Sequence, residues 1–368
     1  MGSASRYRRD GSRDGSREGG RGDGGRSDGG RGDGGRSDGD AGGNRPGLRR
    51  RRGRWRRAVL AALVTGAVVL PLSGAARPEI PAPAPASLAP LNASTLDEAY
   101  AANRANAASA ARMAAGRHER ARAATDRSLA APARHLLAFD GRGPGQVTEV
   151  LGDLARADRI AVLVPGSDTS LDTYGRFHAA AAALHRQLVR KAPAGTRTAV
   201  VAWLGYETPG TVSTTVTTTG RAEQAAPRLR ALVSDLRAIA GDGPRISLLC
   251  HSYGSVVCGR AAAGLAVDDL ALVGSPGTGA DTAAGLRTRA RVWAALGGDD
   301  WVANVPHVSA DLFGTTVGFG TDPVSPAFGA RVFAAGDGGH SDYFRPGTTS
   351  LANLTRIVLG ETEAVTHD

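Results

Sequence analysis

Short apolar runs alternate with amphipathic stretches from about residue 136 to the end of the chain. The runs consist mainly of Val, Ile, Leu and Ala, as strands buried on both faces of a sheet require, and they lie at 160–164, 198–203, 246–250, 270–273, 292–296 and 331–334. Helical spacing of apolar residues marks the stretches between them, at 171–190, 222–239, 255–265 and 349–359. This alternation predicts an α/β domain, a mostly parallel sheet with helices on both faces. The segments 137–140 and 146–150 can add a leading antiparallel pair.

The run at 246–250 ends at a serine that is followed by small residues opening a helix. Ser252 therefore fits a nucleophile elbow, a sharp strand-to-helix turn that needs small residues two positions before and two after the serine. Gly254 meets this need, whereas Cys250 stands where the usual G-x-S-x-G pattern has its first glycine. The alternative interpretation is an ordinary tight turn after a buried strand.

A serine needs a base and an orienting acid, and in this arrangement the acid and then a histidine follow it along the chain. The run at 292–296 leads into a glycine turn that carries Asp299 and Asp300. The spacing from Gly297 favours Asp300 as the acid, with Asp299 left open. The two aspartates could instead cap a short helix that begins at Trp301.

Three histidines follow Ser252, and His340 is the predicted base because it stands in a glycine-rich loop after the run at 331–334. His307 follows a proline, whose fixed backbone angle gives it less freedom. His367 lies among the polar last residues, which tend to fray. A loop histidine that only bonds its neighbours is the alternative for His340.

These residues predict acyl transfer. His340 would take the proton of Ser252 as the serine attacks a carbonyl, and Asp300 would hold the tautomer of the imidazole. The developing oxyanion needs two donors. The backbone N–H of Tyr253 is one candidate, and that of Ser167, in the turn after the run at 160–164, is the other.

Residues 1–57 form a tail that cannot build a core, because they are mainly Gly, Arg, Ser and Asp, and we expect them to be disordered. They contain 17 Arg against 8 acidic residues and so carry +9 of the chain's net charge of +10. The rest of the chain is nearly neutral. The basic composition therefore does not indicate specific nucleic-acid binding.

A basic cluster at 49–57 precedes the apolar run 58–76, which fits a signal peptide or a single membrane anchor. The charge asymmetry predicts that everything after this run is extracytoplasmic, in the cell envelope or secreted. The small residues Ser73, Gly74 and Ala75 suit cleavage, but whether cleavage occurs stays open. An uncleaved run would hold the protein at the membrane.

Residues 77–94 are rich in Pro and Ala and predict a linker. The segment 95–135 predicts a helical accessory region, opened by a capping box at Thr95 to Glu98, that either packs on the main domain or forms a stalk. The main domain is then 136–368.

The chain has two cysteines, Cys250 at the end of a predicted strand and Cys258 on the next helix. Packed layers lie about 10 Å apart, whereas a disulfide needs α-carbons within about 7 Å. We therefore expect two buried thiols, although the compartment would permit a bridge. The sequence contains no motif for a metal or a phosphate loop, so no metal or cofactor is expected.

Five segments resemble the alpha/beta-hydrolase superfamily, and more narrowly an uncharacterised actinobacterial branch of it; they are 164–166, 203–206, 251–255, 318–323 and 339–344. The resemblance implies that Ser252 is the nucleophile, Asp300 the acid and His340 the base. The resemblance indicates the fold and no substrate. From the residues above, the leading prediction is an esterase-like serine hydrolase acting on a small-molecule or lipid-like ester. A peptidase of the same fold and a catalytically silent surface module remain open, as do the substrate and the oligomeric state.

Overall fold

The structure, a computed structural model, describes residues 80–211, 218–305, 309–312 and 315–367. The predicted tail 1–57 and the predicted signal or anchor 58–76 lie outside these residues. Among the residues that are described, no helix is both long and apolar enough to span a membrane.

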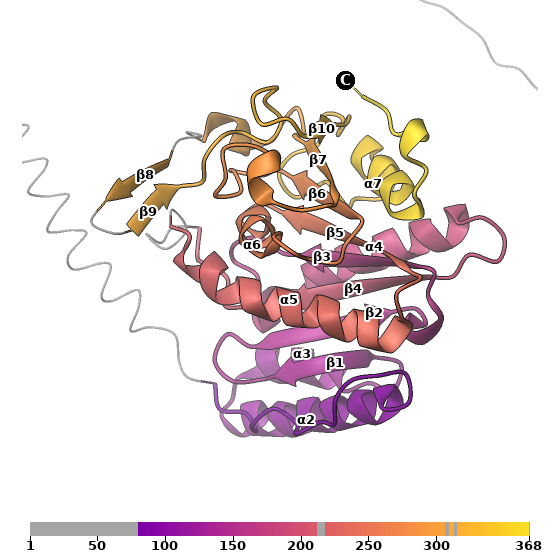
Figure 1. Ribbon diagram of the computed structural model, residues 1–368. Coiled ribbons are helices and arrows are strands. Elements are labelled where there is room, and N and C mark those ends of the chain that lie inside the picture. Colours follow the sequence, from indigo (N-terminus) through magenta and orange to yellow (C-terminus); the bar gives the residue numbers. More distant parts are fainter. Residues whose placement is uncertain (1–79, 212–217, 306–308, 313–314, 368) are drawn as a thin grey trace, which may run out of the picture. The chain divides into compact units, whose positions relative to one another are not determined.

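The core of the domain is an eight-stranded sheet in the order β1-β2-β4-β3-β5-β6-β7-β10 (Figure 1). The strands are β1 (His135–Asp140), β2 (Gln146–Leu151), β3 (Arg159–Val164), β4 (Thr198–Leu204), β5 (Arg245–His251), β6 (Asp269–Val273), β7 (Arg291–Ala295) and β10 (Arg331–Val332). β2 is antiparallel to both β1 and β4, and all pairs from β4 to β10 are parallel. The predicted mostly parallel sheet and its antiparallel leading pair are therefore confirmed.

The last strand is shorter than the predicted run at 331–334. The backbone N–H of Phe333 still donates to the carbonyl of Ala294, but the N–H of Ala334 donates to the carbonyl of Thr366. The C-terminal residues thus replace the neighbouring strand after Phe333, and regular pairing with β7 ends there.

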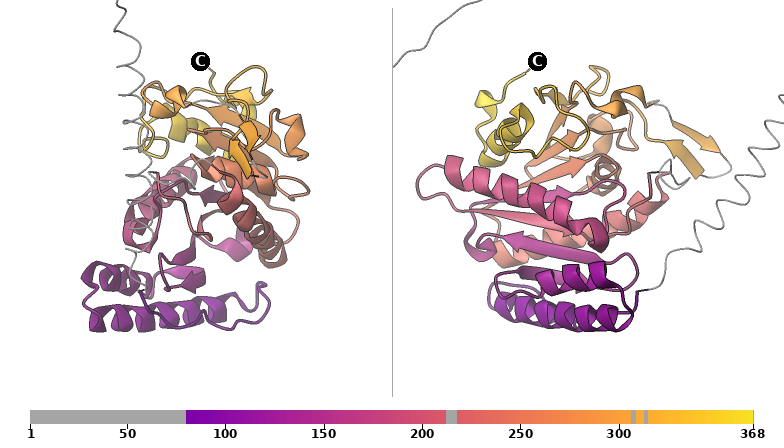
Figure 2. Two further views of the ribbon diagram at one scale, coloured as in Figure 1. Left: turned by 90° about the vertical axis from the view of Figure 1, so that its left-hand side faces the viewer. Right: turned by 180° about the vertical axis from the view of Figure 1, so that it is seen from behind.

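Helices cover both faces of the sheet, as predicted (Figures 1 and 2). One face packs against α5 (Gly220–Ala240) and α6 (Gly254–Ala261), and the other against α4 (Tyr174–Lys191) and α7 (Thr349–Leu359). Successive strand residues point to opposite faces. Ile160 and Val162 therefore belong to the first core, whereas Ala161 and Leu163 belong to the second.

The predicted helical region before the sheet consists of two helices, α2 (Leu96–Gly116) and α3 (Arg120–Leu129). The predicted capping box is wrong, because the Thr95 hydroxyl donates to the carbonyl of Pro90 at 2.9 Å and makes no bond to the helix start. The helices pack on the sheet and do not form a stalk. The amide of Asn103 donates to the carbonyls of Leu136 and Leu137 at 3.0 and 2.9 Å.

A small hairpin, β8 (Ser309–Leu312) and β9 (Thr315–Gly318), forms a separate two-stranded sheet between β7 and β10 in the chain.

Candidate active site

Ser252 lies at the carboxyl end of β5, on a turn that leads within two residues into α6. Its backbone is left-handed, with φ of 55°, a conformation that is uncommon for residues other than glycine. A Cβ at position 254 would lie 2.6 Å from the Val164 carbonyl oxygen and 2.7 Å from that of Pro165. The helix can therefore start this close to β3 only with a glycine at that position.

The two cysteines form a disulfide, so the expectation of two buried thiols is wrong. Their α-carbons are 6.5 Å apart. The layer spacing used for that expectation applies to the body of a helix on a sheet. Cys258, however, lies in a short helix that starts directly at the end of β5, where the chain is still close to the strand. Both cysteines are fully buried.

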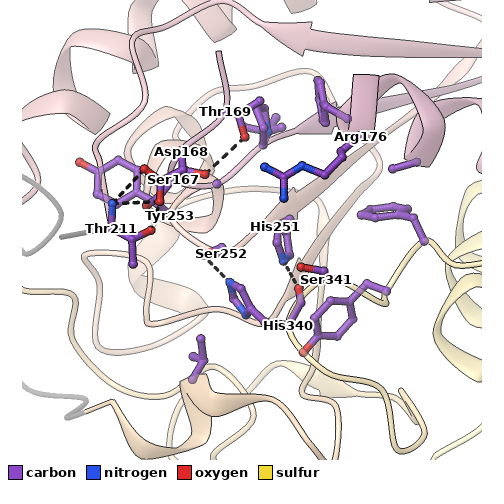
Figure 3. A pocket seen from close by; sticks show the side chains of 18 of the residues that line it. Ser167, Asp168, Thr169, Arg176, Thr211, His251, Ser252, Tyr253, His340 and Ser341 are labelled. Atoms are coloured by element: carbon purple, nitrogen blue, oxygen red, sulfur yellow. Dashed lines mark hydrogen bonds between the residues drawn. The ribbon is translucent and has the colours of Figure 1, made fainter. Parts of the chain in front are cut away.

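The structure brings together the three side chains that the sequence singles out. His340 Nε2 lies 2.9 Å from Ser252 Oγ, and His340 Nδ1 lies 2.9 and 3.0 Å from the two carboxylate oxygens of Asp300 (Figure 3). An ionised carboxylate can only accept, so Nδ1 carries the proton and Nε2 accepts from the serine hydroxyl. The three groups form a directed chain of hydrogen bonds.

Asp300, and not the exposed Asp299, makes the contact with His340. Its Oδ1 also accepts from the Val302 N–H at 2.9 Å, so the carboxylate caps the short 3-10 helix Trp301–Asn304 as well. Burial alone would raise the pKa of Asp300. The hydrogen bonds from His340, Tyr343 and the Val302 N–H outweigh burial and lower this pKa below its usual value, which keeps the carboxylate ionised.

Tyr343 is a site residue to which sequence reasoning gave no role. Its hydroxyl donates to Asp300 Oδ2 at 2.5 Å and accepts from the Gly297 N–H at 2.9 Å. It is buried, and burial together with the bond to Asp300 raises its pKa far above the usual value. Its position three residues after His340 was the available signal. Tyr343 thus fixes Oδ2, one of the two carboxylate oxygens that lie next to His340 Nδ1.

Replacing Tyr343 with Phe is expected to lower kcat for a p-nitrophenyl ester about tenfold, because a hydrogen bond to a charged group is lost. The buried Gly297 N–H also loses its acceptor, which costs about 1–3 kcal/mol of unfolding free energy. Steady-state kinetics and urea unfolding measure the two effects.

Tyr174→Phe is the matched control, because the Tyr174 hydroxyl also donates to a buried carboxylate, that of Glu149, at 2.7 Å. It should lower stability and leave kcat unchanged. Equal kcat in the Tyr343 variant and wild type would show that Asp300 needs no second support.

His251 supports the loop that carries the base. Its Nε2 lies 2.7 Å from the His340 carbonyl oxygen, which can only accept, so this nitrogen is protonated and donates. Burial and the nearby His340 lower the pKa of His251 to about 4. The ring is therefore neutral at neutral pH. It packs on the His340 ring, with 4.6 Å between centroids, and the half-exposed Trp301 also contacts that ring at 4.7 Å.

The backbone of the turn after β3 lies directly against the serine. A Cβ at Gly166 would be 2.6 Å from Ser252 Cβ and 3.1 Å from its Oγ. Within the described residues, the N–H groups of Ser167 and Tyr253 donate to no other group. Two backbone donors without another acceptor therefore lie in the two turns that adjoin Ser252, the turn after β3 and the turn after β5.

A cavity of about 580 Å³ opens beside Ser252 and His340 (Figure 3). Apolar side chains form much of its wall: Leu163, Phe177, Ala180, Leu249, Val305, Phe319 and Phe344. The cavity also reaches Thr211, which bonds to the Asp168 carboxylate. Thr211 begins a threonine-rich segment, of which residues 212–217 lie outside the described part. Among the described residues, no group of three or more His, Cys, Asp or Glu is placed to hold a metal ion.

The sheet with its crossover helices and the serine at an elbow after β5 define the fold class: the domain has the alpha/beta-hydrolase fold. Residues 140–310 match a family model described as alpha/beta hydrolase. The matched residues include Ser252 and Asp300, while His340 lies beyond them.

Two curated relatives come from Mycobacterium tuberculosis: "Uncharacterized protein MT2140" of strain CDC 1551 / Oshkosh and "Uncharacterized protein Rv2079" of strain ATCC 25618 / H37Rv. Each is 29% identical over 262 residues, which cover 63% of this chain and 39% of the relative. The matched part of this chain thus spans about two fifths of the relatives' length. Both belong to an actinobacterium and are uncharacterised, in keeping with the branch that the sequence resembles.

Solved structures of similar fold include an a/b serine hydrolase without lid, XC6422 from Xanthomonas campestris, with 16% sequence identity and a TM-score of 0.38 over 63% of this chain and 95% of that one. Esterase PE8 is 18% identical, with a TM-score of 0.37 over 58% of this chain and 97% of the other.

Proposed function

We propose that this protein is an extracytoplasmic serine hydrolase that cleaves a carboxylic ester through an acyl-enzyme on Ser252. The observation that carries the proposal is the hydrogen-bonded chain from Ser252 Oγ through His340 to Asp300 at the edge of a cavity. Nucleophile, base and orienting acid each have the contact that their role requires.

In the proposed reaction, Ser252 Oγ attacks the ester carbonyl while His340 Nε2 takes the hydroxyl proton. The bond between the acyl carbon and the alcohol oxygen breaks, and the alcohol leaves with that proton. Water then attacks the acyl-serine with His340 again as base, which releases the carboxylic acid and restores the serine. Asp300 stabilises the imidazolium in both steps.

The N–H groups of Tyr253 and Ser167 are the proposed donors to the oxyanion. Preorganised donors of this kind cost no rearrangement during the reaction, and each is worth about 3 kcal/mol in the transition state. The free state of both N–H groups in the described part of the chain supports this assignment.

The largely apolar wall of the cavity suits the hydrocarbon part of a small or lipid-like ester. A volume of about 580 Å³ falls within the range of small-molecule sites.

The Cys250–Cys258 disulfide supports the extracytoplasmic location, because such bonds persist mainly in oxidising compartments. In this proposal, the basic cluster and the apolar run at 49–76 act as the export signal or membrane anchor. Cell fractionation and sequencing of the mature N-terminus test it, and recovery of the protein in the cytosol with its N-terminus intact would overturn it.

A fluorophosphonate probe tests the nucleophile, because it labels only serines activated by a base. We expect labelling of wild-type protein, none of Ser252→Ala, and full labelling of Ser341→Ala, which removes another hydroxyl from the wall of the same cavity. Folded but unlabelled wild-type protein would overturn the proposal and favour the catalytically silent module. Faster turnover of aminoacyl anilides than of p-nitrophenyl esters would instead indicate a peptidase.

A further inference from the structure

The described residues in the wall of the cavity include one arginine, Arg176, in the first turn of α4. Its guanidinium points into the cavity, beside Thr169 and towards the ring of His251 (Figure 3). The arginine is exposed to solvent, and it lines the same cavity as Ser252. A fixed positive charge therefore faces the space in which a substrate would lie.

Arg176 has no partner within the described residues. No carboxylate lies within ion-pair distance of it, no carbonyl accepts from it, and no aromatic ring lies beneath its guanidinium. The domain's other arginines near this end of the sheet do have partners, as Arg221 has in Glu207 at 2.7 Å. An unpaired guanidinium is ordinary on an open surface. Because Arg176 is exposed, water can satisfy its five donors, and the guanidinium is free to bind an anionic group that enters the largely apolar cavity.

Among the described residues that line the cavity, Asp168 carries the only carboxylate, and that carboxylate binds elsewhere. It accepts from the Thr211 N–H at 3.1 and 3.2 Å and from the Thr211 hydroxyl. The Asp168 carboxylate therefore binds Thr211 and does not compensate the positive charge of Arg176.

We propose that Arg176 binds an oxyanion, a carboxylate or a phosphate, at the end of the substrate remote from the scissile ester. The inference rests on the proposed ester hydrolysis at Ser252 and names its substrate class: esters with one anionic end and an apolar chain between that end and the scissile ester. The guanidinium fork matches both oxyanions bidentately, and the partly enclosed cavity strengthens the pairing relative to open water. The apolar wall between the two ends would contact the chain.

Binding to the inactive variant Ser252→Ala tests the inference without turnover. Titration calorimetry compares monomethyl esters of straight-chain diacids, from succinate to sebacate, with the corresponding neutral dimethyl esters. We expect the best monoanion to bind about 10- to 100-fold more tightly than its neutral partner, and Arg176→Gln in this background to abolish the difference. Phosphonate analogues of the best chain length separate phosphate from carboxylate preference.

Arg186→Gln is the matched control, because Arg186 is an exposed arginine on the same helix that does not line the cavity. It removes the same charge and should keep the preference for the monoanion. Equal binding of the monoanionic and neutral esters, or the same loss in the Arg186 and Arg176 variants, would overturn the inference.

Kinetics on active protein keeps this inference separate from the proposed function. The p-nitrophenyl monoesters of the same diacids should lose about 10- to 100-fold in kcat/KM in Arg176→Gln, a larger loss than for p-nitrophenyl butyrate, whereas Arg186→Gln should cleave both kinds of ester as wild type does. Cleavage of the neutral ester without a preference for the anionic esters would overturn the proposed anion site and leave the proposed hydrolase activity standing. Absence of all cleavage, with binding of the monoanion intact, would overturn the proposed hydrolase activity and leave the anion site standing.

Discussion

Replacing Asp300 with Asn is expected to lower kcat about ten-thousand-fold on any ester that the protein cleaves, and Asp299→Asn to leave kcat unchanged. The carboxylate of Asp300 accepts from His340 Nδ1, which keeps the proton on that nitrogen and leaves Nε2 free to accept from Ser252. An asparagine can turn its NH₂ towards Nδ1. The imidazole then carries its proton on Nε2 and cannot act as the base.

The fold should survive this change, because the side-chain oxygen of an asparagine can still cap the helix at Trp301 as Asp300 does. Kinetics with a p-nitrophenyl ester measures kcat, and urea unfolding checks the fold. Asp299 is the stringent control, since it is the adjacent aspartate, is exposed and has no contact with His340. Equal kcat in the two variants would remove Asp300 from the mechanism.

Removing the disulfide with Cys250→Ala and Cys258→Ala should lower the unfolding free energy by about 2.5 kcal/mol, the chain-entropy value for so short a loop. The bond joins residues only 8 positions apart, at the two ends of the elbow that holds Ser252. We therefore also expect a lower kcat, because the serine keeps its left-handed backbone only while β5 and α6 hold the turn. Urea unfolding and ester kinetics measure both quantities.

Reductant gives the matched comparison. It should destabilise wild-type protein as much as the double substitution does, and it should not affect the double variant. The bridge is fully buried, so reduction requires partial unfolding first. Two free thiols in denatured, unreduced protein, or an unchanged urea midpoint in reductant, would contradict this expectation.

The strands could be predicted because their positions depend on local composition. Runs such as Ile160–Val164 are apolar on both faces, which only a covered sheet accommodates. The order β1-β2-β4-β3 could not be predicted, because pairing between distant strands leaves no local pattern. The early end of β10 has the same origin, since it depends on where Thr366 returns to the sheet.

Ser252, Asp300 and His340 could be singled out because each follows a predicted strand, and the carboxyl ends of parallel strands lie at one edge of a sheet. The contacts that support these three residues could not be predicted from the sequence. The bond from Tyr343 to Asp300 depends on the exact path of the loop after His340. The disulfide depends on how closely a short helix leaves its strand, and there the general layer spacing gave the wrong expectation.

The packing of α2 on β1 limits how far the protein can be shortened. β1 is the outermost strand on its side of the sheet, and its pairing with β2 is irregular between Leu136 and Ala138. Asn103 covers that irregularity by donating to two of its carbonyls. A truncated protein that begins at β1 would leave the edge of this strand uncovered. The edge strand of a second molecule could then pair with it, so we expect self-association. Recombinant work on the hydrolase domain should therefore retain both preceding helices.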